Sequence, residues 1–165
     1  MKSTALIVGI VGAVGLMTVG SVSAQQNVTD EMLRTAQEDP NNWLMATGNY
    51  TGNRFSKLGQ INTGNVGDLV PKWIFSLGVL DAQNTTPVIH DGVMYATASH
   101  GRTYAIDASK GTELWRYAHE LPEGVAGKMC CDIGNRGVAL YGDKVFVATP
   151  DAHVVALDKA TGEVI

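Results

Sequence analysis

A repeated block in the second half of the sequence most limits the folds open to this chain. The run Tyr-Ala-Ile-Asp-Ala-Ser-Lys-Gly-Thr-Glu at 104–113 returns as Val-Ala-Leu-Asp-Lys-Ala-Thr-Gly-Glu at 155–163, so that Asp158 lies 51 positions after Asp107. A β-rich hairpin pattern with an Asp-Gly or a Gly-Asp turn precedes each copy. A four-strand unit that recurs after roughly 40–50 residues is typical of a β-propeller, although a Greek-key sandwich also contains such hairpins. We therefore predict an all-β fold and favour a propeller over a sandwich.

The β-rich runs also indicate how much of a propeller is present. We expect strands at 72–76, 86–89, 93–97, 103–106, 113–117, 137–141 and 144–149, and a short helix at about 29–38 with Thr29 as its cap. These runs supply two to three blades. The second copy of the repeat stops at Ile165, just before the position of Trp115 in the first copy. Because a propeller must close to protect its edge strands, we expect a truncated front piece of a longer protein.

The N-terminus has the three parts of a secretory signal peptide. Lys2 supplies a positive start, residues 5–19 carry no charge, and Ser-Val-Ser-Ala at 21–24 places small residues at a cleavage site. The apolar core is shorter than the roughly 20 residues that a membrane-spanning helix needs. We predict a signal peptide at 1–24, no stable membrane span, and an exported domain at 25–165. The net charge of −4 and the lack of a basic run argue against nucleic acid as a partner.

The chain's two cysteines, Cys130 and Cys131, are sequence neighbours. Neighbouring Cα atoms lie about 3.8 Å apart, which is closer than the roughly 4.4–6.8 Å of an ordinary disulfide. A bridge between them would therefore be strained, and two reduced, buried thiols are the alternative. Export to an oxidising compartment favours the vicinal disulfide.

Several short strings resemble the pyrroloquinoline-quinone (PQQ) dependent alcohol dehydrogenases of the methanol and ethanol dehydrogenase type. They are Asn42-Trp43, Gly48-Asn49-Tyr50, 53–56, 60–62, Asn65-Val66, 71–76, 91–95, the turn 105–115, and Cys-Cys-Asp-Ile-Gly-Asn-Arg-Gly at 130–137. The resemblance covers about residues 28–165, and the cysteine string is its most specific part. In this family the propeller has eight blades.

The resemblance implies four cofactor-binding residues. The family's vicinal disulfide maps onto Cys130 and Cys131, whose ring lies flat on the PQQ rings, and Arg136 matches an arginine that contacts the quinone oxygens. Asn84 stands where the family commonly has a glutamate near a PQQ carboxylate, and an amide can donate a hydrogen bond to a carboxylate.

The resemblance also implies a periplasmic enzyme that oxidises primary alcohols to aldehydes and passes electrons to a cytochrome c. Its cofactors would be PQQ and Ca²⁺ or a lanthanide. The metal ligands and the catalytic aspartate of the family lie beyond this chain, so we expect no catalytic residue here and no activity of the chain alone.

Two other interpretations are open. A non-enzymatic exported propeller scaffold shares the turn at 105–115 that docks one blade on the next, here called the docking turn, which begins again at Ala156. Such a scaffold lacks vicinal cysteines and usually has a lipid-acceptor cysteine after its signal, where this chain has Gln25. A sugar-type quinoprotein dehydrogenase is usually anchored by several membrane helices, for which we find no segment. The four histidines, at 90, 100, 119 and 153, show no metal-ligand spacing, so no metal site is predicted from them. We interpret Asp107 and Asp158 as turn caps, and Trp73 and Trp115 as packing between blades.

Overall fold

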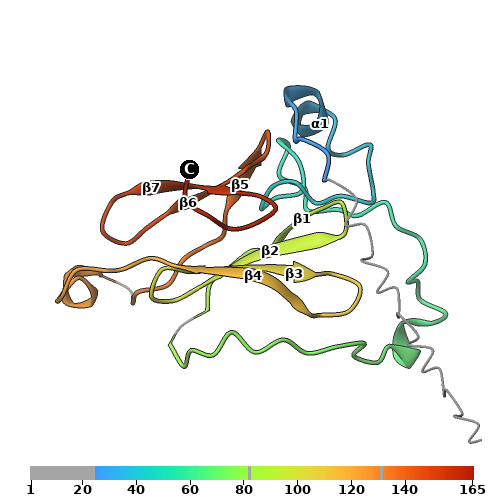
Figure 1. Cartoon of the computed structure of the whole chain (residues 1–165). Helices are drawn as coiled ribbons and strands as arrows, with labels where there is room; N and C mark the ends of the chain where they lie inside the picture. Colours follow the sequence, from blue (N-terminus) through green and yellow to red (C-terminus); the bar gives the residue numbers. More distant parts are fainter. Residues whose placement is uncertain (1–24, 82, 131) are drawn as a thin grey trace, which may run out of the picture.

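Two antiparallel sheets, stacked on one another, form the body of the chain (Figure 1). The computed structural model describes residues 25–81, 83–130 and 132–165. The predicted signal peptide at 1–24 therefore lies outside the described residues. In that part of the chain which the structure describes, no helix is long and apolar enough to cross a membrane.

Each sheet is a meander in which every strand pairs with its sequence neighbour. The first sheet contains β1 (Val88–His90), β2 (Val93–Ala98), β3 (Arg102–Asp107) and β4 (Glu113–Ala118), and the second contains β5 (Ala139–Tyr141), β6 (Lys144–Ala148) and β7 (Val154–Asp158). A meander of up to four antiparallel strands is the unit of a propeller blade. The predicted all-β propeller fold is thus confirmed, with two sheets in the place of the expected two to three blades.

The register of the strands repeats with the sequence. Val93 of β2 pairs with Asp107, and Lys144 of β6 pairs with Asp158. Each residue of the second pair lies 51 positions after its counterpart in the first pair. An isolated bridge between Leu157 and Val164 lies beside β7, at the place that the pair Ile106–Glu113 takes in the first sheet. The second sheet is therefore built on the same plan as the first.

The core lies between the two sheets. Tyr95, Ala105 and Trp115 of the first sheet pack against Val145, Val147 and Leu157 of the second. Burial of this apolar surface, at roughly 25 cal/mol per Å², is the main force that holds one sheet on the other.

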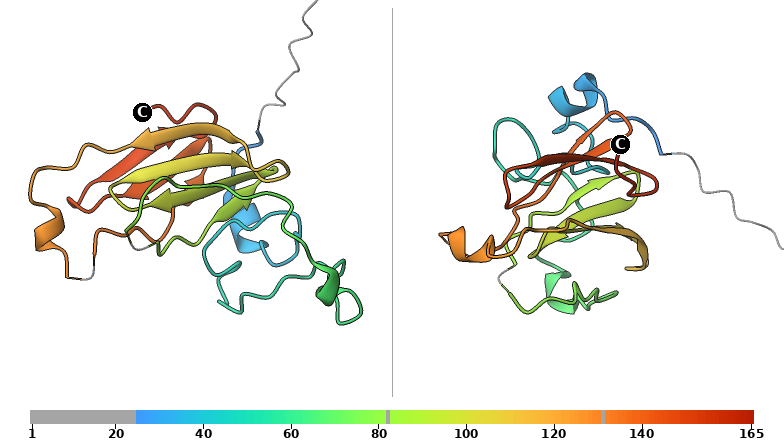
Figure 2. Two further views of the ribbon diagram at one scale, coloured as in Figure 1. Left: turned by 90° about the horizontal axis from the view of Figure 1, so that it is seen from below. Right: turned by 60° about the vertical axis from the view of Figure 1, so that its left-hand side comes forward.

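The opposite face of the first sheet is covered by the segment 72–80, which runs along it in the views of Figures 1 and 2. Its side chains alternate between half-buried and exposed positions, and Phe75 stacks edge-on against Tyr104 with ring centroids 5.6 Å apart. The expectation of a strand at 72–76 was nevertheless wrong, because no described strand pairs with it. Alternation is a property of one segment, whereas a strand also needs a neighbour for its backbone hydrogen bonds.

The described residues also contain three short helices: α1 (Asp30–Arg34) and two 3₁₀ helices at Val66–Asp68 and Ala126–Lys128. Thr29 caps α1 as predicted, with its side chain accepting a hydrogen bond from the backbone N–H of Met32. The helix is shorter than the expected 29–38. The Thr35 hydroxyl donates to the Glu31 carbonyl at the C-terminal end, and the chain continues as turns to 38.

Candidate cofactor site

The predicted cofactor motif 130–137 lies in the connection from β4 to β5. Ile133 anchors this connection, because only 4% of its surface is exposed. Asp132 has a positive φ of 79°, and its side chain accepts a hydrogen bond of 2.6 Å from the backbone N–H of Ile133. The local fold of the motif is therefore shaped by its own aspartate and by one buried apolar residue.

Asn135 joins the motif to both sheets. Its side-chain amide donates to the carbonyl of Ala148 in β6 at 2.7 Å, and its Oδ1 accepts from the backbone N–H of Gly137 at 2.9 Å. Its own carbonyl accepts from the hydroxyl of Thr97 in β2 at 3.3 Å. The residue before Arg136 is thus held in place from two sides.

The end of the motif touches the segment that contains Asn84. The backbone N–H of Thr86 donates to the carbonyl of Arg136 at 3.1 Å. Gly137 has a φ of 123°, and a Cβ atom there would lie 2.7 Å from the Thr86 carbonyl oxygen. Only glycine permits this approach, because any side chain would strain the backbone and collide with a main-chain atom.

Hydroxyl groups hold the segment around Asn84 on the end of β2. Thr85 Oγ1 accepts from the backbone N–H of Thr97 at 3.0 Å, and the two hydroxyl oxygens are also 3.0 Å apart. Gln83 lies 3.5 Å from the hydroxyl of the buried Ser99. Asn84 is exposed between these two anchored neighbours.

Three of the four predicted cofactor residues can be placed. Asn84, Cys130 and Arg136 are all exposed, and the backbone contact between Thr86 and Arg136 brings the segments of Asn84 and Arg136 together. Cys131 lies outside the described residues, and the predicted disulfide with it. The roles of all four residues toward a cofactor therefore stay predictions.

The loops of the two docking turns, 107–111 and 158–162, lie at the ends of the strands that are far from the predicted cofactor motif. In the first turn, Asp107 Oδ1 accepts from the backbone N–H groups of Ser109 and Lys110, at 2.9 and 3.1 Å, and from the Ser109 hydroxyl. Lys110 also places its ammonium group 3.1 Å from Asp107 Oδ2. The side chains of Ser109 and Lys110, and to a lesser degree the two backbone N–H groups, hold the pKa of Asp107 well below its usual range. Asp158 makes the corresponding bonds to the backbone of Ala160 and Thr161. The interpretation of both aspartates as turn caps is confirmed.

Each docking turn receives a tryptophan from the preceding segment or sheet. Trp73 Nε1 donates to the Ala108 carbonyl at 3.0 Å, and Trp115 Nε1 donates to the Lys159 carbonyl at 3.1 Å. Each indole lies directly against the glycine of the turn. A Cβ atom at Gly111 would lie 2.5 Å from the Trp73 ring, and a Cβ atom at Gly162 would lie 2.6 Å from the Trp115 ring. The predicted packing role of both tryptophans is confirmed.

A cavity of about 680 Å³ lies at this turn end of the sheets, lined by residues of both docking turns. Lys159 is buried beside it, with its Nζ 3.3 Å from His90 Nδ1 and donating to the Gln26 carbonyl. Burial lowers the pKa of Lys159. The pKa of His90 is also lowered, mainly by burial and secondly by the positive charge of the nearby Lys159. The cavity is at the opposite end of the strands from Arg136 and Thr86, so it is not the predicted cofactor site.

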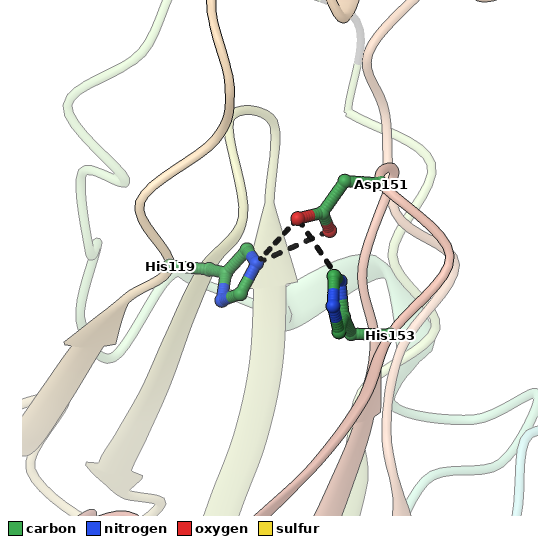
Figure 3. A group of neighbouring side chains, drawn as sticks. All are labelled: His119, Asp151 and His153. Carbon is green, nitrogen blue, oxygen red and sulfur yellow. Dashed lines mark hydrogen bonds and ion pairs between the residues drawn. The ribbon is translucent and has the colours of Figure 1, made fainter.

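The structure also groups three side chains that the sequence did not connect. His119, Asp151 and His153 lie close enough together to share an ion (Figure 3). The spacing of the histidines predicted no metal site. The Asp-x-His string at 151–153 was the available signal, but the third member of the group is 32 positions away from Asp151.

Comparison with known proteins identifies the family. Residues 43–165 match the family model described as the β-propeller domain of glucose, ethanol and alcohol dehydrogenases that use PQQ. The chain belongs to the PQQ-dependent alcohol dehydrogenase family. A 1-butanol dehydrogenase (quinone) of Thauera butanivorans is 52% identical over 114 residues, which are 68% of this chain and 18% of that protein. A quinoprotein ethanol dehydrogenase of Pseudomonas aeruginosa is 41% identical over 155 residues, 93% of this chain and 24% of that protein.

Solved structures of the quinoprotein family share the fold. A quinohemoprotein alcohol dehydrogenase from Comamonas testosteroni superposes with a TM-score of 0.80 at 37% identity, over 84% of this chain and 21% of that one. A europium-containing methanol dehydrogenase gives a TM-score of 0.76 at 33% identity, over 82% and 24% of the two chains. The present chain thus spans about a fifth of the length of the relatives that it matches.

Proposed function

We propose that this chain forms the first blades of an exported quinoprotein that oxidises primary alcohols to aldehydes and transfers the electrons to a cytochrome c. The observation that carries the proposal is the closure of the end of the motif, Arg136 and Gly137, onto the segment of Asn84. That closure requires Gly137 and is made by the hydrogen bond from Thr86 to Arg136. It leaves exposed polar side chains at one end of the first sheet.

The residues present fit a PQQ molecule, which is planar and carries carboxylates. The Arg136 guanidinium is exposed and suited to oxygen atoms that gain negative charge. The exposed amide of Asn84 could donate to a cofactor carboxylate. A vicinal disulfide of Cys130 and Cys131 would supply a flat surface for the rings. When bound, PQQ supplies the two-electron oxidant, and this chain's residues would hold and orient it.

The remaining parts of the proposal concern the whole protein. Ca²⁺ or a lanthanide would accompany PQQ, with its ligands outside this chain, and the catalytic base would also lie outside it. Because one of the similar solved structures is a europium-containing methanol dehydrogenase, the lanthanide alternative has support from a relative. The signal-peptide pattern at 1–24 supports export to the periplasm, where the disulfide could form.

The test uses the protein purified with any sequence that flanks this chain in its gene. PQQ is added with Ca²⁺ or with a lanthanide, and reduction of a dye acceptor is followed with ethanol and with methanol. We expect PQQ binding, seen as a change in its absorbance, and dye reduction that depends on the alcohol. A protein that neither binds PQQ nor reduces the dye would contradict the proposal and favour a scaffold propeller.

The role of Arg136 has its own test. Arg136→Gln should weaken PQQ binding by roughly tenfold or more, because a charge-assisted hydrogen bond to the cofactor contributes about 1.5–3 kcal/mol. The matched control is Arg34→Gln on the exposed side of α1, which should leave PQQ affinity unchanged. Equal loss in both variants would show a general charge effect, and the specific role of Arg136 would be wrong.

A further inference from the structure

Three potential metal ligands, from connections of both sheets, lie together (Figure 3). His119 Nε2 lies 3.0 Å from Asp151 Oδ2, and His153 Nδ1 lies 3.1 Å from the same oxygen. All three ligand atoms are within 4.8 Å of one another. His119 follows β4 of the first sheet, whereas Asp151 and His153 belong to the turn between β6 and β7 of the second.

The backbone fixes the position of His119. Its N–H donates to the Gly101 carbonyl at 3.0 Å, and Gly101 has a φ of 68°. A Cβ atom at Gly101 would lie 2.9 Å from the His119 Cβ, so the two backbones approach as closely as a glycine allows. The histidine is therefore directed toward the second sheet by main-chain packing.

Side-chain contacts orient two of the three ligands. The Tyr117 hydroxyl lies 2.9 Å from His119 Nδ1, which leaves Nε2 facing Asp151. The Thr149 hydroxyl donates to Asp151 Oδ1, and so leaves Oδ2 toward the two histidines. The side chain of Asp151 is only 9% exposed and that of His119 only 16%, while that of His153 is 66% exposed. Two ligands are held, and the third can adjust.

We propose that His119, Asp151 and His153 form a binding site for a first-row transition-metal dication such as Zn²⁺, and that the ion links the first sheet to the second. Two neutral imidazoles and one carboxylate are ligands that Zn²⁺ commonly accepts, with a fourth position left to water. Ligand atoms at about 2.0–2.1 Å from a tetrahedral ion lie about 3.3 Å apart. The two separations from Asp151, 3.0 and 3.1 Å, need to change by only a few tenths of an ångström. The two histidine nitrogens lie within 4.8 Å of each other, and the exposed His153 is the ligand that would move to close that distance.

The corresponding turn of the first sheet provides an internal comparison. At the offset of 51 positions, His100 takes the place of Asp151, and Arg102 takes the place of His153. His100 pairs with Asp81 at 2.7 Å, while Arg102 donates to the Gly78 carbonyl at 3.1 Å. Because the permanently charged Arg102 replaces a histidine in the turn of the first sheet, that turn contacts the segment of Asp81 through one His–Asp pair. The additional histidine distinguishes the second turn.

The experiment is a metal titration of the purified protein, with its flanking sequence retained and its metals first removed by a chelator. Zn²⁺ affinity is measured by calorimetry or by competition with a chromophoric chelator, and Co²⁺ reports the geometry of its ligands through its visible absorption. His153→Gln removes one exposed ligand and should fold normally. His100→Gln is the matched control, because it changes the equivalent turn of the first sheet.

We expect His153→Gln to lose at least tenfold in Zn²⁺ affinity, and to lose the tetrahedral Co²⁺ spectrum, relative to the wild-type protein and His100→Gln. Tyr117→Phe tests a positioning residue and should reduce affinity by roughly 10–100-fold, as loss of a partner behind a ligating histidine commonly does. Saturating Zn²⁺ should raise the melting temperature of the wild type and of His100→Gln but not of His153→Gln.

Equal Zn²⁺ affinity and equal Co²⁺ spectra in the wild type and His153→Gln would overturn the proposal. The three side chains would then act as a metal-free hydrogen-bonded link between the sheets. Metal affinity and spectra are measured without alcohol or PQQ, and the ligands are not among the predicted cofactor residues. The outcome is therefore independent of the proposed dehydrogenase function.

Discussion

Individual glycines are required where one main chain passes against another group. Gly111 and Gly162 lie beneath the indoles of Trp73 and Trp115, and Gly137 lies against the Thr86 carbonyl oxygen. Gly137 bears on the proposed function, because it ends the predicted cofactor motif. Its positive φ and its contact with a backbone atom leave no room for a side chain to move aside.

Substitution of Gly137 should therefore open the motif. Gly137→Ala is expected to lower the free energy of unfolding by more than about 1 kcal/mol, because alanine is strained at this φ and its Cβ meets Thr86. The measurement is denaturant unfolding. Gly127→Ala is the control in the same connection, where a Cβ would meet nothing within 4 Å and φ is not positive. Similar stabilities of the two variants would contradict the required close approach.

At the scale of elements, the contact of a tryptophan with the next docking turn recurs along the chain. Trp115 is 8% exposed, stands in the core cluster beside Tyr95, and donates to the Lys159 carbonyl. The turn that receives it is shaped by Asp158. The sheets are thus joined by apolar burial in the middle and by a directed hydrogen bond at the turn end.

Removal of this indole should loosen the second sheet from the first. We expect Trp115→Ala to lower the free energy of unfolding by about 3–5 kcal/mol, the usual effect of deleting a large buried aromatic side chain. Leu114→Ala is the adjacent control, because Leu114 is 53% exposed and should change stability by less than about 0.5 kcal/mol. Denaturant unfolding compares the two, and equal effects would show that docking of Trp115 is not a principal contact.

At the scale of the whole molecule, the segment 72–80 lies on the first sheet without a strand partner among the described residues. Its inward side chains contact Tyr104, whose hydroxyl donates to the Leu77 carbonyl at 2.7 Å. Its outward side chains include Ile74, 88% exposed, and Leu80, fully exposed. Exposed apolar side chains on an unpaired segment are a known cause of association between chains.

Residues 25–165 expressed alone should consequently self-associate. Light scattering at increasing protein concentration is expected to show growing particles, and a double substitution, Ile74→Lys with Leu80→Lys, should reduce the growth strongly. Ser76→Lys with Lys57→Ser moves a charge without removing an apolar group and serves as the control. A monodisperse wild-type chain, or an equal effect of both double variants, would contradict the prediction.

Much of the fold could be predicted because its signals are local. The strands β2, β3 and β4 begin and end within one residue of the expected ranges, and the Asp-Gly turn and the docking turns use short-range hydrogen bonds that the sequence pattern specifies. The Cys130–Gly137 motif predicted the family for a similar reason, since its residues are contiguous. The cofactor roles of Asn84, Cys130, Cys131 and Arg136 stay predictions.

The sequence by itself determined the repeat, the turn chemistry and the family, because each depends on residues close together in the chain. Only the tertiary structure decided three other features. The segment at 72–76 is unpaired among the described residues, Gly137 meets Thr86 across 51 positions, and His119 faces Asp151 and His153. The physical reason is common to all three: pairing and ligand convergence depend on how one sheet is placed against another, and no spacing along the chain records that placement.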